Sequence, residues 1–338
     1  MTVAFGHATV LFGFRPGSSY LAVDLFFVLS GFVLAHAYDQ KIARGMGTID
    51  FMRIRLIRLY PIYCLGTLAT TFAILIALGG TKGTTWSLSN LAASFPLAMA
   101  FLPTPPGLAP REAIYPLDTP AWSLAFELVV NLAFVMAWRM LSIRRLTIIV
   151  VLAGIALIFT AFHYGDLSAG SDWRTLLGGF PRVFFSFPLG VLMLRLYRER
   201  NLRVQLSPLL PLAIMLAVLI VEPSARLRPA YDLACIMLVF PLVVAAGATA
   251  QPLRFAAPFA VLGALSYALY ALHFPLMEMT ISALTKITHG NLLRYQPWAG
   301  FAFIGVALVA AYVADAWVDA PVRRWLLKAI PTRAKRVA

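Results

Sequence analysis

Charged residues are scarce in this sequence. Asp, Glu, Lys and Arg make up 12% of its 338 residues, whereas 61% are hydrophobic. An ordinary soluble domain is about half apolar and about a quarter charged, so the composition excludes that class. The apolar runs are long and continuous, which favours helices over a closed barrel, whose strands give short alternating segments. We therefore expect an all-α polytopic membrane protein.

Cysteines and the common metal and phosphate motifs are also lacking. The two cysteines, Cys64 and Cys235, both fall in apolar runs, so no disulfide framework is expected. The sequence has no H-E-x-x-H or C-x-x-C spacing, no Gly-rich phosphate loop and no G-x-S-x-G elbow. We therefore expect neither a metal site nor a permanently bound cofactor.

Acidic residues are half as numerous as basic ones, 14 against 28, which gives a net charge of +14. Such an excess can indicate nucleic-acid binding. In a membrane protein, however, basic residues mark the orientation of the chain and contact anionic lipid. We expect membrane lipid, and no nucleic acid, as a partner.

The apolar runs predict about ten transmembrane helices in one bundle. With both termini in the cytoplasm, most basic residues lie on the inner side, as the positive-inside rule requires. Residues 1–330 then form one transmembrane domain and residues 331–338 a basic cytoplasmic tail. The predicted spans are residues 1–13, 20–38, 58–79, 121–140, 146–163, 176–197, 208–221, 231–249, 258–279 and 299–319.

Two segments between the third and fourth spans are not expected to cross the membrane. Residues 88–102 are apolar but short and contain Pro96, which predicts a re-entrant or interfacial segment. Residues 103–120 are rich in proline and cannot form a long helix. This outer loop is either a lid or a plain connector.

Asp24 is the one carboxylate in the predominantly apolar stretch 18–38. A charge inside a spanning helix is costly and usually faces a bundle interior or a water-filled cavity, so Asp24 is a candidate functional residue. Alternatively, it complements the positive N-terminal end of the helix, with Ser18 and Ser19 as caps. His7, in the apolar stretch before it, adds a side chain that titrates near neutral pH.

A polar stripe follows Asp118 in the chain. Ser123, Glu127 and Asn131 are at positions i, i+4 and i+8, on one face of the predicted helix. Such a stripe faces protein rather than lipid, either as a helix–helix contact or as a functional site. The carboxylate at Glu127 favours function, because it is harder to bury than an amide or a hydroxyl.

A second stripe lies in the ninth span, where Ser266, Tyr270 and His273 share one face just before Pro275. The aromatic residues alone indicate packing. A histidine on the same face makes a functional role equally plausible, because imidazole is rare in apolar spans.

A basic run precedes the third span. Arg55 and Arg58 are i, i+3 neighbours, so both guanidinium groups can reach one anion, with Arg53 close by. The alternative is an anchor that binds lipid phosphate.

Four stretches together resemble the membrane-bound acyltransferase 3 family, which includes bacterial polysaccharide, O-antigen and nodulation-factor O-acetyltransferases. They are LAVDLFFVLSGFVL at 21–34, RLIRLYP at 55–61, TPAWSLAFE at 119–127 and LGALSYALYALHFP at 262–275. The resemblance covers most of the chain in order and implies a ten-helix membrane bundle. The sequence departs from the family pattern at Leu128, where a second glutamate is usual.

The resemblance implies an O-acyltransferase of the bacterial cytoplasmic (inner) membrane. It would move an acyl group, in the simplest case acetyl, from cytoplasmic acyl-CoA to a hydroxyl of a cell-surface or exported glycan or glycolipid. His7 would be the general base, oriented by Asp24 or Glu127, or would carry the acyl group covalently. Arg53, Arg55 and Arg58 would hold the CoA phosphates. Substrate contacts would come from Trp122, Ser123, Tyr270 and His273.

A proton-coupled transporter or flippase of a glycolipid is the alternative function. Asp24, Glu127 and His273 would then form a proton relay. The arginine cluster favours the enzyme, because a permease needs no site for CoA phosphates.

The start of the chain raises a further expectation. The family carries an Arg-x10-His motif whose histidine matches His7, and its arginine would precede Met1. The first span, residues 1–13, is also shorter than the ~20 residues that a spanning helix needs. We therefore expect the natural chain to start upstream.

Overall fold

The protein is predominantly helical over the residues that this computed structural model describes, namely 2–14, 17–79, 84–200, 207–249 and 257–329. Within these ranges there is no strand, only an isolated bridge between Ala113 and Asp172. The predicted all-α polytopic membrane fold is confirmed, while the predicted tail 331–338 lies outside the described residues. In chain order the helices are α1 (Thr2–His7), α2 (Thr9–Phe12), α3 (Ala22–Ala43), α4 (Thr48–Leu78), α5 (Leu88–Met99), α6 (Ala121–Ala137), α7 (Ile143–Tyr164), α8 (Leu176–Arg200), α9 (Leu209–Ile220), α10 (Arg228–Ala234), α11 (Phe240–Thr249), α12 (Ala257–Ile287), α13 (Trp298–Ala314) and α14 (Ala320–Ala329).

Eight helical segments in the described ranges are long and apolar enough to cross a membrane. They include α10 with α11 and α13 with α14, each pair joined without a break by a π-helical turn. Two predicted spans are shorter in the structure: residues 1–13 are divided into α1 and α2, and 208–221 correspond to the 12-residue α9. The predicted number of about ten spans is therefore approximate.

The break between α1 and α2 sets the position of His7, the last residue of α1. Ala8 leaves the helical conformation, with φ −82° and ψ 26°. Gly6 allows α1 to approach the start of α3, because a Cβ on Gly6 would lie 2.0 Å from Ser19 Oγ. Ala4, Ala8 and Leu11 join a hydrophobic cluster with side chains of α12 and α13. His7 is thereby brought to α12.

The helices α3 and α8 cross in direct backbone contact. A Cβ on Gly31 would lie 2.0 Å from Phe187 O, and a Cβ on Gly190 would lie 2.1 Å from Val28 O. Small residues permit such close crossings in membrane bundles, where packing rather than the hydrophobic effect drives helix association. This crossing holds α3, with Asp24, against α8 in the centre of the bundle.

We expect Gly190→Ala to destabilise the protein by about 1–3 kcal/mol, because the added methyl group forces the two backbones apart. The measurement is the melting temperature of the purified protein in detergent. Gly305→Ala in α13 is the matched control, since a Cβ there meets nothing within 4 Å. Equal melting temperatures for the two variants would contradict the close crossing.

The helix α5 packs beside α4, and the proline-rich loop 103–120 contacts α12 and the α7–α8 loop. At 12 residues, α5 is shorter than a span, and it accepts hydrogen bonds at Ala98 O and Met99 O from Tyr63 and Tyr60 of α4. The loop 103–120 is hydrogen-bonded to the α7–α8 loop, where Ile114 N donates to Ser171 O at 3.0 Å. Arg111 reaches Glu278 of α12 at 2.7 Å. The lid and connector interpretations of this loop both stay predictions.

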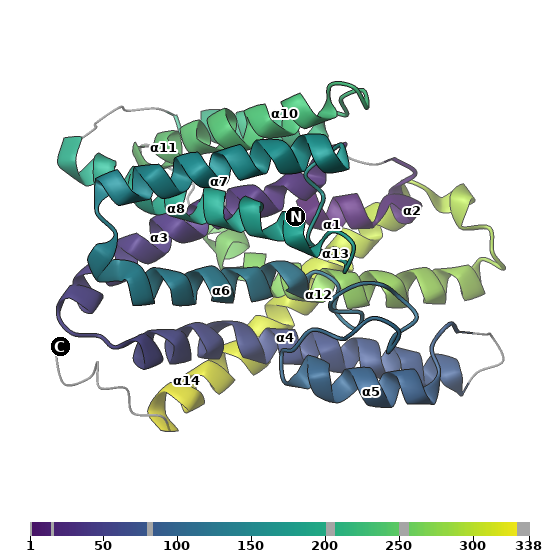
Figure 1. Ribbon diagram of the computed structural model, residues 1–338. Helices are drawn as coiled ribbons and strands as arrows, with labels where there is room; N and C mark the ends of the chain where they lie inside the picture. Colours follow the sequence, from purple (N-terminus) through teal and green to yellow (C-terminus); the bar gives the residue numbers. More distant parts are fainter. Residues whose placement is uncertain (1, 15–16, 80–83, 201–206, 250–256, 330–338) are drawn as a thin grey trace.

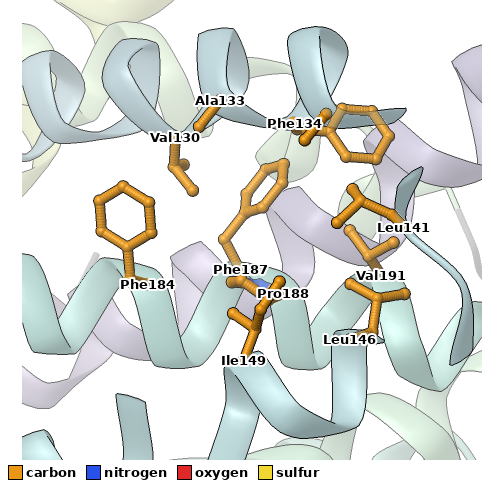
Figure 2. A pocket seen from close by; sticks show the side chains of 11 residues that line it. Val130, Ala133, Phe134, Leu141, Leu146, Ile149, Phe184, Phe187, Pro188 and Val191 are labelled. Carbon is orange, nitrogen blue, oxygen red and sulfur yellow. The ribbon is translucent and has the colours of Figure 1, made fainter. Parts of the chain in front are cut away.

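Figure 1 shows the α6–α7 turn, the α3–α4 connection and α14 at the same end of the bundle, on the left of the view. The helix α5 lies towards the opposite end, on the right of the view. Between α6, α7 and α8 lies a cavity of about 100 Å³, and its lining residues include Phe134, Phe184 and Phe187 (Figure 2).

Candidate active site

Two histidines from distant parts of the chain meet where α1 touches α12. His7 Nδ1 lies 2.8 Å from His273 Nε2, and the rings are stacked with centroids 5.1 Å apart. His273 Nδ1 lies 2.5 Å from the backbone oxygen of Tyr270. His273 is 0% exposed, whereas His7 is exposed. The pair therefore has a buried member and an accessible one.

The hydrogen bonds indicate which nitrogen of each ring carries a proton. A carbonyl oxygen only accepts, so His273 donates from Nδ1 to Tyr270 O. The Nε2 of neutral His273 must then accept, and His7 donates to it from Nδ1. It follows that Nε2 of neutral His7 carries a lone pair, which is what a general base requires.

Tyr270 and Ser123 form a second polar pair beside the histidines. Their hydroxyl oxygens are 2.6 Å apart, and both lie 3.1 Å from the backbone oxygen of Pro120. The ring of Tyr270 is parallel to that of Phe26 on α3, with centroids 6.4 Å apart. The start of α6, the middle of α12 and the first half of α3 thus converge here, as the shared faces predicted for Ser123 and Tyr270 allow.

Glu127, one turn further along α6, forms a buried ion pair with Arg55 of α4. Its Oε1 accepts from Arg55 Nη2 at 2.5 Å and from Ser30 Oγ of α3 at 2.8 Å. The exposed fraction of the side chain is 1% for Glu127 and 13% for Arg55. Two residues from separate sequence motifs are therefore brought into direct contact.

Several buried polar atoms around this ion pair have no hydrogen-bond partner in the described part of the chain. They are Glu127 Oε2, Arg55 Nε and both terminal atoms of the Asn131 amide. Buried polar atoms are nearly always hydrogen-bonded, so a group of orphans calls for an explanation. A ligand with amide or hydroxyl groups would satisfy them.

The other two arginines of the basic run point elsewhere. Arg58 Nη1 lies 3.3 Å from Asp319, in the turn between α13 and α14, and its guanidinium group lies over the ring of Tyr267. Arg53 lies 3.9 Å from Asp50 and its side chain is 49% exposed. The structure thus gives Arg55 and Arg58 different carboxylate partners rather than one shared anion.

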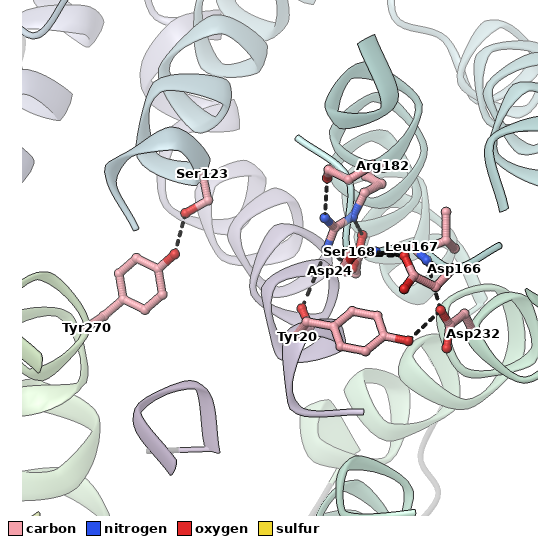
Figure 3. A network of polar contacts seen from close by, with 10 residues as sticks. Tyr20, Asp24, Ser123, Asp166, Leu167, Ser168, Arg182, Asp232 and Tyr270 are labelled. Atoms are coloured by element: carbon pink, nitrogen blue, oxygen red, sulfur yellow. Dashed lines mark hydrogen bonds and ion pairs between the residues drawn. The ribbon is translucent and has the colours of Figure 1, made fainter. Parts of the chain in front are cut away.

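Asp24 is bound to a residue that the sequence analysis did not select. Arg182 of α8 makes a bidentate ion pair with it, with Nη2–Oδ2 at 2.6 Å and Nε–Oδ1 at 3.1 Å (Figure 3). The side chains are 1% and 0% exposed. Arg182 also donates to Ala169 O at 2.5 Å. The sequence could have indicated Arg182 as a candidate, because it is a charged residue inside the predicted apolar span 176–197.

The partners of these carboxylates differ from what the sequence suggested. Asp24 or Glu127 was expected to orient the imidazole of His7, but their hydrogen bonds connect them to Arg182, Arg55 and Ser30. His7 is hydrogen-bonded instead to His273. A histidine expected among the substrate contacts thus lies against the predicted base.

Trp122 is enclosed by its neighbours. The guanidinium group of Arg182 lies 5.1 Å from a ring centroid of Trp122. On another side, a Cβ on Gly170 would lie 2.6 Å from the ring, and Gly170 has φ +120°, so a side chain is excluded there. With 7% of its surface exposed, Trp122 links the Asp24–Arg182 pair to the start of α6.

Asp118 is a further buried carboxylate that the sequence analysis passed over as a candidate. It is 1% exposed, and neither carboxylate oxygen has a hydrogen-bond partner among the described residues. A Cβ on Gly66 of α4 would lie 3.5 Å from its Oδ2 and 2.9 Å from Ala271 O of α12. Burial raises the pKa of Asp118 well above its usual range.

This burial predicts a pH-dependent gain in stability for Asp118→Asn. The unfolded chain loses this proton near pH ~3.9, whereas the folded protein keeps it to a higher pH. The folded state is therefore destabilised as the pH rises between the two pKa values, and the amide removes that penalty. We expect the melting temperature of the variant to exceed that of the wild type by more at pH 8 than at pH 5. The exposed Glu199→Gln is the control, and a gain independent of pH would contradict an ionising Asp118.

The profile of the acyltransferase domain matches residues 1–315. The chain belongs to the membrane-bound acyltransferase 3 family. Two named relatives agree with this. The acyltransferase MdmB of Streptomyces mycarofaciens is 27% identical over 337 residues, covering 90% of this chain and 81% of the relative. Protein 2 in the picA locus of Rhizobium radiobacter is 37% identical over 166 residues, covering 47% of this chain and 86% of the relative. No solved structure matches.

In this acyltransferase, the four motif segments lie on α3, α4, α6 and α12, which meet around the residues just described. In the described part of the chain, no three His, Cys, Asp or Glu side chains are grouped so that they could hold a metal ion. The polar groups that the described residues bring together here are the imidazoles, hydroxyls, carboxylates and guanidinium groups named above.

Proposed function

We propose that this membrane acyltransferase moves an acyl group, in the simplest case acetyl, from acyl-CoA to a hydroxyl of an exported or cell-surface glycan or glycolipid. The observation that carries the proposal is the chain of hydrogen bonds from Tyr270 O through His273 to His7. It leaves the lone pair of His7 on Nε2, at the exposed member of the pair. A general base for an alcohol is what O-acyl transfer requires.

The reaction can be written with few groups. His7 Nε2 takes the proton from the acceptor hydroxyl as its oxygen attacks the thioester carbonyl carbon. A C–O bond forms, the C–S bond breaks, and the imidazolium returns the proton to the departing thiolate. His273 stabilises the imidazolium by accepting a hydrogen bond from its Nδ1–H, as the aspartate of a Ser-His-Asp catalytic triad does for its histidine. Attack by His7 itself on the thioester would give a covalent intermediate instead.

The Tyr270–Ser123 pair would bind the substrate in this scheme. One of their two O–H protons joins the hydroxyls, which are 2.6 Å apart, and the other can donate either to Pro120 O at 3.1 Å or, in its place, to a substrate oxygen. We assign them to the thioester carbonyl oxygen or to the acceptor sugar, with Trp122 behind them as a rigid support.

The donor site would lie towards the arginine-rich end. The pantetheine arm of CoA carries two amide groups, which match the orphaned atoms of Glu127, Arg55 and Asn131. Its phosphates would be bound by Arg58 and Arg53, the more exposed members of the basic run. Arg55, already paired with Glu127, would then shape the site as well as contribute charge.

We expect Arg58→Lys to raise the KM for acyl-CoA about tenfold with a small change in kcat, since one charge-assisted hydrogen bond is worth about 1.5 kcal/mol. Purified protein in lipid nanodiscs and labelled acetyl-CoA give both constants. Arg324→Lys in α14 is the control, because Arg324 is exposed and, among the described residues, donates only to Ala320 O. An unchanged KM for Arg58→Lys would remove Arg58 from the donor site.

We place the enzyme in the bacterial cytoplasmic membrane with both termini in the cytoplasm. The arginine-rich end would then face the pool of acyl-CoA, and the histidine pair would lie nearer the outer side. The transport alternative needed Asp24, Glu127 and His273 to form one relay. Their hydrogen bonds instead give each a separate partner, and family membership favours group transfer.

Incubation of the reconstituted protein with acetyl-CoA labelled in the acyl group tests the function. We expect release of free CoA and label in the glycan fraction of the native cell envelope, dependent on His7. Movement of unlabelled glycolipid across the vesicle without release of CoA would overturn the proposal.

A further inference from the structure

The cavity between α6, α7 and α8 is separate from the candidate active site and is entirely hydrophobic. Its volume is about 100 Å³, and all eleven lining residues are apolar (Figure 2). Phe184 and Phe187 of α8 face Val130 and Phe134 of α6 across it. Most voids in a protein interior are smaller than a water molecule, and an apolar space of this size excludes water and admits apolar groups.

The helices around the cavity face the lipid. Met136 of α6 is 69% exposed, and Ile148 and Leu152 of α7 are 49% and 62% exposed. Large exposed apolar side chains on spanning helices lie against acyl chains, which are the one apolar material that surrounds the protein on all sides. An acyl chain of a membrane lipid is therefore the occupant of matching chemistry.

A basic turn adjoins the cavity at the end where α6 joins α7. Leu141 and Leu146 line the cavity, and the residues that separate them begin α7. Arg139, Arg144 and Arg145 are exposed, and none of them forms an ion pair within the described ranges.

The position of these charges on α7 also favours an anion. Arg144 and Arg145 lie in the first turn of a 22-residue helix, where the helix dipole is positive and cations are unfavourable. Ser142 caps the helix by accepting a hydrogen bond from Arg145 N at 3.3 Å. The other backbone amides of the first turn have no partner within the helix, as at any helix start. Arg145 Nη1 donates to Met140 O at 2.9 Å, so a phosphate at this place would accept from the other guanidinium N–H groups and from the helix terminus.

We propose that the cavity and the basic turn together form a binding site for one anionic phospholipid of the membrane. A short section of one acyl chain enters the space between α6, α7 and α8, and the phosphate group is bound by Arg139, Arg144 and Arg145. The site is independent of the proposed acyl transfer. It supports α6 beside Asn131 and Glu127, because Val130 and Phe134 line the cavity from the same helix.

Native mass spectrometry of the detergent-purified full chain tests the site. The probes are phosphatidylglycerol and phosphatidylcholine with the same chains. We expect one phosphatidylglycerol to bind at least tenfold more tightly than phosphatidylcholine. The triple variant R139Q/R144Q/R145Q should lose this preference, since each basic residue near an anionic lipid strengthens binding roughly fivefold. The triple variant R44Q/R226Q/R294Q removes the same charge from exposed arginines elsewhere and should keep it.

The acyl-chain part of the site needs its own variant. Ala133→Phe fills the cavity and should weaken binding of both lipids, whereas Met136→Phe, on the exposed face of the same helix, should leave it unchanged. For the unaltered protein, glycerophosphoglycerol without chains should fail to compete with phosphatidylglycerol, a result that does not depend on how any variant folds. Equal affinity for the two lipids, or equal effects of the two arginine triples, would overturn the proposal.

Discussion

Replacing His7 with alanine is expected to lower the rate of acyl transfer about 10²–10⁴-fold, the usual effect of losing a general base. The amount of protein in the membrane should stay near normal, because His7 is exposed and ends a six-residue helix. The measurement is the transfer of label from acyl-CoA in membranes that hold equal amounts of each protein. His163→Ala, an exposed histidine on α7, is the control and should keep full activity.

The partner of His7 gives a sharper form of the same test. His273→Gln retains an oxygen that accepts from His7 Nδ1–H, whereas His273→Leu retains none. We expect kcat to fall further in the leucine variant than in the glutamine variant, with KM values close to that of the wild type. The pH–rate profile should also shift in both, because the group that stabilises the imidazolium has changed. Activity above about a tenth in His7→Ala, or identical losses in the two His273 variants, would contradict this arrangement.

The sequence predicted which residues share a helix face, because that depends on local periodicity alone. Ser123 and Glu127 on α6, and Tyr270 and His273 on α12, do face the interior, where all four are in contact with other helices. Ser266, predicted to share the face of Tyr270 and His273, is instead exposed and donates to Gly263 O. A spacing of 3.6 residues per turn therefore predicted the direction of the face but not how far along the helix it stays buried.

The partners across the bundle could not be predicted in the same way. His7 and His273 are 266 positions apart, and Asp24 and Arg182 are 158 apart. Nothing in the spacing of one helix indicates which face of another helix will meet it. The hydrophobic pattern also failed at the short elements: Ala8 breaks the first apolar run into α1 and α2 through its backbone conformation, which the composition of that run does not reveal.

Removing Arg182 is expected to have the largest effect on stability. Asp24 would be left buried without its cation, and breaking a buried ion pair from one side costs about 3–5 kcal/mol. Arg182→Met should therefore lower the melting temperature sharply and release Trp122, which now packs against the guanidinium group. Arg174→Met is the matched control, because Arg174 pairs with Glu112 at 2.7 Å but both side chains are largely exposed, and such pairs contribute about 0–1 kcal/mol.

The double variant Asp24→Asn with Arg182→Met separates the ion pair from its environment. If the cost of the single variant comes from an uncompensated carboxylate, neutralising Asp24 should recover most of the lost stability, giving a coupling energy of about 3 kcal/mol in the double-mutant cycle. Additive losses would mean that each side chain acts through packing alone. Arg182 contacts both Asp24 and Trp122. If the double variant recovers stability but not acyl transfer, the ion pair also positions Trp122 and the start of α6 for the reaction.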